Sequence, residues 1–97
     1  MSFVTYRTEV KTYHGLSAVE VVQALERDAA AYPERGAPLA RFLTWSLSQF
    51  ADTIPPRDRL VSPVLSDETL ALWFLAVCEE YGLGSLSLSR REAEAGS

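Results

Sequence analysis

The sequence predicts an α+β fold, in which three helices pack on a small two-stranded antiparallel sheet in the order β-α-α-α-β. Residues 3–13 alternate between apolar and polar side chains, residues 83–89 alternate again, and three longer segments between them carry apolar side chains at helical spacing. Elements of this kind bury their apolar faces most simply against one another. An all-α three-helix bundle with extended ends is the alternative.

The length of 97 residues is that of one domain. Hydrophobic residues make up 47% of the chain and charged residues 23%, which is typical of a globular protein. We therefore expect a compact domain over residues 1–89. The polar sequence RREAEAGS predicts a frayed C-terminal tail over residues 90–97.

The first strand is predicted over residues 3–13, where β-branched and aromatic residues alternate with charged ones. A helix then begins at Ser17, because the sequence from Ser17 to Glu20 matches a capping box. Apolar residues recur at helical spacing as far as Tyr32, and Pro33 and Gly36 end the helix.

Pro38 suits the first turn of a second helix, since proline has no N–H that would be left without a partner there. The apolar stripe of this helix is predicted to contain Leu39, Phe42, Leu43, Ser46, Leu47, Phe50 and Ile54. Trp45 falls outside the stripe, among polar residues that include Arg41.

Residues 54–65 are predicted to be a linker, in which Pro63 keeps residues 60–65 extended, and Ser66 caps the third helix. Asp67 and Glu68 lie in its first turn, where the helix dipole favours negative charge. The helix is apolar on nearly every side, because Leu72 and Leu75 lie opposite its main apolar face. A domain with three helices buries such a helix with difficulty, so Leu72 and Leu75 are expected either to be buried by their own chain or to meet a partner.

Composition excludes several classes of function. The net charge of −4 argues against a nucleic-acid surface, which needs a basic patch. One cysteine and one histidine predict neither a disulfide nor a metal site, and no motif predicts a cofactor. The longest apolar run, residues 70–78, is too short to span a bilayer, and no signal peptide is seen, so we expect a cytoplasmic protein without membrane contact.

The leading hypothesis is a small non-enzymatic module for protein–protein interaction, such as a regulator, adaptor or inhibitor, because no catalytic constellation is visible in the sequence. Aromatic residues and arginine are common anchors of interfaces. The predicted contact with a protein partner, or with a second copy in a homodimer, therefore uses Arg41, Trp45, Leu72 and Leu75.

The alternative is a small-molecule-binding protein or minimal enzyme, with a pocket between sheet and helices. Its predicted residues are Tyr13, His14 and Ser17, because free N–H groups at a helix start can bind an anion and His14 could act as a base. A structural explanation of the same residues is simpler: Ser17 is already committed as a helix cap. No acid is placed by the sequence to orient the imidazole.

Overall fold

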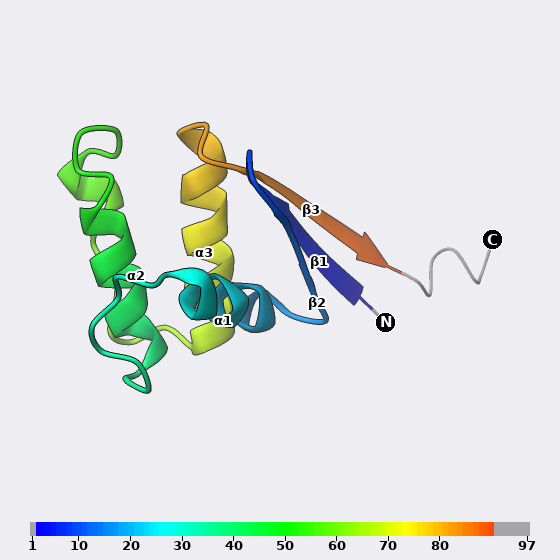
Figure 1. Ribbon diagram of the computed structural model, residues 1–97, viewed down its shortest axis with the longest axis horizontal. Helices are drawn as coiled ribbons and strands as arrows, with labels where there is room; N and C mark the ends of the chain where they lie inside the picture. The colour runs from blue at the N-terminus through cyan, green and yellow to red at the C-terminus, as the bar shows by residue number, and fades with distance from the viewer. Residues whose placement is uncertain (1, 91–97) are drawn as a thin grey trace.

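The computed structural model describes residues 2–90 and confirms the α+β class, with three helices beside an antiparallel sheet (Figure 1). The helices are α1 (Ala18–Asp28), α2 (Leu39–Ser48) and α3 (Asp67–Glu80), and a short 3₁₀ helix, η1, covers Pro56–Asp58. The strands are β1 (Ser2–Arg7), β2 (Thr12–Gly15) and β3 (Ser85–Arg90), in the spatial order β2-β1-β3. Residues 91–97 of the predicted tail lie outside the described residues.

The sheet has three strands rather than two, because the segment predicted as one strand over residues 3–13 is a hairpin of β1 and β2. The Thr8 hydroxyl oxygen accepts the backbone N–H groups of Val10 (3.3 Å) and Lys11 (3.1 Å) and donates to the Lys11 carbonyl (2.9 Å). Such bonds let threonine stabilise a turn without glycine or proline. The turn also changes which residues face the core: Tyr13 is buried, whereas Val10 is 92% exposed.

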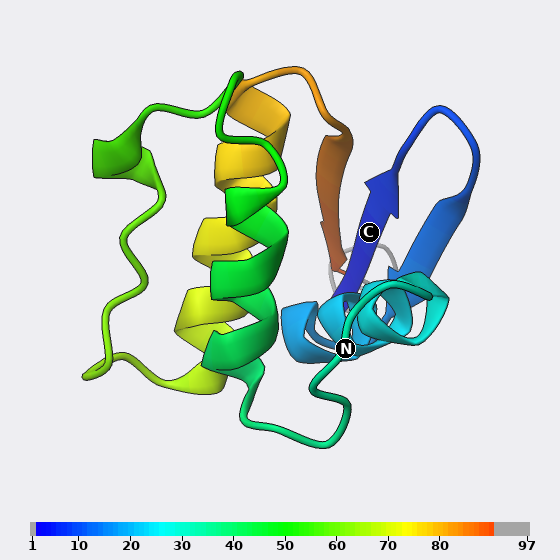
Figure 2. The same cartoon turned by 60° about the vertical axis from the view of Figure 1, so that its left-hand side comes forward.

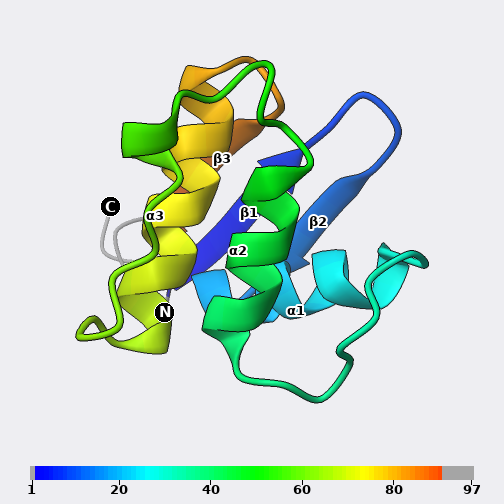
Figure 3. The same cartoon turned by 90° about the vertical axis from the view of Figure 1, so that its left-hand side faces the viewer.

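The helices form a layer on one side of the sheet. α1 packs against β1, β2 and α3, and α3 packs against β3, whereas α2 lies against α3 on its side away from the sheet (Figures 1 and 3). Val4 and Tyr6 of β1 point into this layer and are buried among the helices. The core therefore lies between the sheet and the helices.

The linker between α2 and α3 runs alongside these two helices, as Figure 2 shows. α2 ends at Ser48, earlier than its apolar stripe suggests, but Ile54 beyond it is still fully buried. The Tyr81 hydroxyl donates a hydrogen bond to the Asp58 carboxylate, which fastens the linker to the end of α3. The linker is thus part of the core's boundary.

α3 has neighbours on several sides, which corrects the prediction that Leu75 contacts a partner. Helices α1 and α2 and strand β3 all pack against α3. Leu75 is fully buried among residues of its own chain, and Leu72 is half-buried. Leu75 is therefore not accessible to another molecule.

Side chains form hydrogen bonds with backbone groups at both ends of α1. The Ser17 hydroxyl oxygen accepts the Glu20 N–H (3.2 Å), which confirms the predicted cap. The helix ends at Asp28, before the predicted Tyr32, and the Arg35 guanidinium donates to the Glu26 carbonyl (2.8 Å) and to the Ala29 carbonyl. A cation at this end also complements the helix dipole.

Candidate functional site

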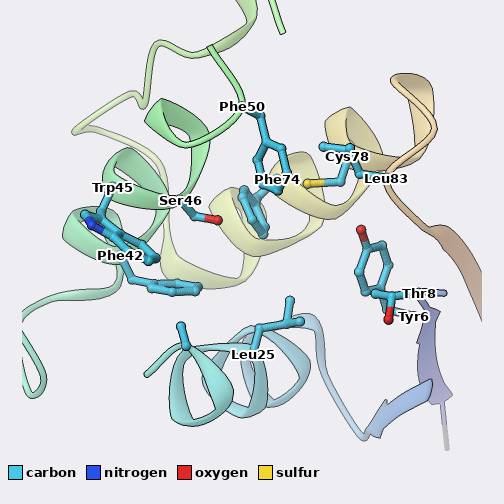
Figure 4. Close-up of a pocket in the computed structure, with 11 residues that line it drawn as sticks. Tyr6, Thr8, Leu25, Phe42, Trp45, Ser46, Phe50, Phe74, Cys78 and Leu83 are labelled. Carbon is cyan, nitrogen blue, oxygen red and sulfur yellow. The ribbon is translucent and has the colours of Figure 1, made fainter. Parts of the chain in front are cut away.

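A cleft with a volume of about 210 Å³ lies between β1 and the helices (Figure 4). Most of its wall is aromatic or aliphatic, so we call it the aromatic cleft. Its lining residues come from β1, the turn that follows, α1, α2, α3 and the loops after the helices: Tyr6, Thr8, Leu25, Ala29, Phe42, Trp45, Ser46, Phe50, Phe74, Cys78 and Leu83.

Trp45 belongs to the wall of this cleft as well as to the surface. Its ring lies 5.2 Å from that of Tyr32 and 6.1 Å from that of Phe42, between ring centroids. Trp45 is half-buried and packs against the core, so it is not the isolated surface residue that helical periodicity suggests. In Figure 4, Trp45 and Phe42 form one end of the cleft, and the Ser46 hydroxyl points from α2 toward Phe74.

Tyr6 forms the sheet side of the aromatic cleft, and its position depends on Gly84. A Cβ atom added at Gly84 would lie 2.3 Å from the Tyr6 ring and hydroxyl. Glycine is therefore needed here for close approach, not for an unusual backbone angle. The loop before β3 can pass directly over the tyrosine, which keeps Tyr6 pointing at the helices.

The polar atoms inside the aromatic cleft are uncharged near neutral pH. Burial raises the pKa of the Cys78 thiol to about 11. Burial, with a smaller effect of Cys78, raises the pKa of the Tyr6 phenol well above its usual value. A thiol held in this way is a poor nucleophile. The interior is therefore suited to an uncharged, mainly apolar group.

A shallower recess of about 410 Å³ adjoins the aromatic cleft. We call it the outer recess. Thr8, Phe50 and Leu83 line both spaces, so the two share a wall. The outer recess is completed by residues of the β1–β2 hairpin and the end of α3: Glu9, Val10, Tyr13 and Gly82.

The hairpin is fastened to α1 beside the outer recess. The Tyr13 hydroxyl and the Lys11 ammonium both donate to Oδ2 of Asp28, each at 2.8 Å, and the Lys11 nitrogen lies 5.0 Å from the centre of the Tyr13 ring. The bonds from Lys11 and Tyr13 lower the pKa of Asp28. Burial and the bond to Asp28 raise the pKa of Tyr13 to about 12.

Of the three residues predicted to form a pocket, only Tyr13 lines one of these spaces. His14 lies on the exposed face of the sheet, with Nδ1 3.2 Å from the Thr5 hydroxyl oxygen. The predicted anion site at the start of α1 is filled by the chain itself: the Glu68 carboxylate accepts the N–H groups of Ala18 and Val19, and Ser17 serves as the cap.

Arg41 and Leu72 lie apart from the aromatic cleft. Arg41 is exposed and pairs with Glu34 at 2.9 Å, and neither Arg41 nor Leu72 lines the aromatic cleft or the outer recess. Apolar surface is instead exposed on the linker, where Leu60 is 75%, Val64 86% and Leu65 42% accessible.

Sequence periodicity did not indicate the aromatic cleft. Phe42 and Phe74 are recognisable as core residues by their helical spacing, but the space between them depends on how β1, α1, α2 and α3 pack. Glu9 likewise carries no signal of its own in the sequence. The close contact between Gly84 and Tyr6 joins residues that only the folded chain brings together.

Within residues 2–90, no group of His, Cys, Asp and Glu side chains is arranged to hold a metal ion. Over the same part of the chain, none of the helices has the length and apolar character that crossing a bilayer requires. No family model, curated protein or solved structure matches the chain significantly.

Proposed function

We propose that this protein is a small non-enzymatic binding module that takes an apolar group, such as one aromatic ring, into the aromatic cleft. The observation that carries the proposal is a cleft of about 210 Å³ with aromatic walls and uncharged polar groups. An apolar cavity of about 150 Å³ is enough to bind benzene. Pockets for drug-sized ligands are larger, about 300–1,000 Å³. One ring therefore matches the available space.

The chemistry of the residues favours binding over catalysis. The Cys78 thiol is in the wrong protonation state for attack, since its pKa is about 11. His14, the other candidate for acid–base chemistry, contacts Thr5 on the opposite face of the sheet from the helices. A nucleophile and its base must lie within hydrogen-bonding reach of each other. Cys78 lies in α3 on one side of the sheet and His14 on the other side, so the two cannot form such a pair.

Trp45 provides a direct test of the proposal, because it lines the aromatic cleft. In a Trp73→Phe background, Trp45 is the only tryptophan, so its fluorescence reports on this site alone. Titration with 2-phenylethanol should change the emission in a saturable way. Absence of a saturable change, together with no heat of binding by calorimetry, contradicts the proposal.

Two serine variants form a matched pair for this test. Ser46 lines the aromatic cleft, whereas Ser48 is exposed on the same helix. Ser46→Leu fills the cleft and should abolish binding of 2-phenylethanol, while Ser48→Leu should bind like the parent. Equal binding by both variants would place the ligand elsewhere.

A second candidate function is self-association or contact with a protein partner through the linker. The observation that favours it is the exposure of Leu60, Val64 and Leu65, which lie close together in the sequence. Light scattering after size exclusion tests it: the parent should be a homodimer, and a Leu60→Ser, Val64→Ser variant a monomer. A monomeric parent removes self-association.

A further inference from the structure

We infer that the ligand class of this site is an arylalkyl amine, with its ring in the aromatic cleft and its ammonium group beside Glu9 in the outer recess. The inference rests on the proposed function, because it assumes that the aromatic cleft binds a ring. It adds the charge and the orientation of the ligand. Thr8, Phe50 and Leu83 line both spaces, so the two lie side by side, and the proposed ligand reaches from one into the other.

Glu9 is the only Asp, Glu, Lys or Arg residue among those that line either space. It lies on the hairpin turn and is exposed. Its sequence neighbour Lys11 is already paired with Asp28, at 2.8 Å. No ion pair within the described residues involves Glu9, so its carboxylate is available to a ligand.

The side-chain hydroxyl groups of the outer recess are already committed to the fold. The Thr8 hydroxyl holds the hairpin turn, where it accepts from Val10 and Lys11 and donates to the Lys11 carbonyl. The Tyr13 hydroxyl donates to Asp28. Glu9 therefore supplies the carboxylate of the outer recess, and an ammonium group is the natural partner of a carboxylate.

Exposure of Glu9 limits the size of this charge effect. A carboxylate–ammonium pair at a surface favours the amine over a neutral analogue by roughly two- to five-fold in affinity. The preference should shrink as salt is raised, because exposed charges are screened. An anionic analogue should bind more weakly than the neutral one, since it would meet the same carboxylate.

The test compares three probes of similar ring and chain: 2-phenylethylamine, 2-phenylethanol and 3-phenylpropionate. Trp45 fluorescence in the Trp73→Phe protein and calorimetry give the affinities at low and high salt. The amine should bind most tightly and the acid most weakly. Glu9→Gln should remove the preference for the amine and leave the affinity for the alcohol unchanged.

Glu34→Gln is the matched control, because it removes the same charge at a residue that lines neither space. This variant should retain the preference for the amine. Equal affinity of amine and alcohol, or a preference that survives Glu9→Gln, overturns the inference while leaving the proposed function intact. Failure of all three probes to bind overturns both, and tighter binding of the acid overturns the inference alone.

Discussion

Glu68, in the first turn of α3, accepts a hydrogen bond from the backbone N–H of Ala18 at the start of α1, with Oε2 2.9 Å from the nitrogen. Its other oxygen, Oε1, lies 3.1 Å from the Val19 nitrogen. The carboxylate thus satisfies two donors that a helix leaves unpaired and complements the positive end of the dipole. One side chain joins two helices and closes the place where a ligand anion was predicted.

Replacing Glu68 by Ala should lower the free energy of unfolding by about 1–2 kcal/mol, since both N–H groups lose a charged acceptor. Urea denaturation measures the change. Asp67→Ala is the control: Asp67 is an exposed acid in the same turn, so its loss should cost about 0.3–1 kcal/mol through the dipole alone. Equal costs for the two variants would mean that Glu68 contributes nothing through α1.

Leu75→Ala should cost about 2–5 kcal/mol of stability, because the Leu75 side chain is fully buried and its truncation leaves a cavity. Leu60→Ala, at a position 75% exposed, should change stability by less than about 0.5 kcal/mol. Denaturation of both variants separates core from surface. If Leu75→Ala instead unfolds like the parent and only lowers the mass seen by light scattering, Leu75 is an interface residue after all.

The hydrogen bonds from Lys11 and Tyr13 to Asp28, which join the β1–β2 hairpin to α1, should weaken in acid. The pKa of Asp28 is lowered by its bonds from Lys11 and Tyr13, from an ordinary value of 3.8. A carboxyl group whose pKa is lower in the folded state contributes stability above that ordinary value, and the contribution is lost as pH falls through the folded pKa. Asp28→Asn should therefore lower the urea midpoint at pH 7 and differ less from the parent near pH 3. A difference that is the same at both pH values contradicts this explanation.

Cys78 should react slowly with thiol reagents in the folded protein. The thiol is buried and its pKa is about 11, so little thiolate is present at pH 8. Labelling followed by absorbance should be slow in buffer and fast in denaturing urea. Fast labelling without urea would show that the aromatic cleft opens widely to solvent.

Local features of the fold could be predicted where residues of one segment act on each other. The cap at Ser17, for example, depends on a residue only a few positions away, Glu20. The hairpin turn was missed because Thr8 stabilises it with side-chain bonds and no glycine or proline marks it. The sequence left open whether Leu75 is buried by its own chain or meets a partner, because its burial depends on how α1, α2 and β3 surround α3.

The candidate site could not be predicted either, because it too depends on how separate helices and strands pack. Its walls combine Tyr6 of β1 with Phe42 of α2 and Phe74 of α3, and no spacing along the chain relates these residues. The only predicted pocket residue that lines either space, Tyr13, lies in the outer recess. The residue types at the start of α1 predicted an anion site there. The carboxylate of Glu68, from a distant segment of the chain, occupies that position instead.

Binding of a single aromatic ring in the aromatic cleft is most directly tested by nuclear magnetic resonance. Spectra of the ¹⁵N-labelled protein recorded during titration with 2-phenylethanol should show saturable shifts that concentrate at residues around the cleft, among them Leu25, Ser46, Cys78 and Leu83. Ser46→Leu should abolish these shifts. Shifts that do not saturate, or that concentrate around His14 and Ser17, would contradict the account.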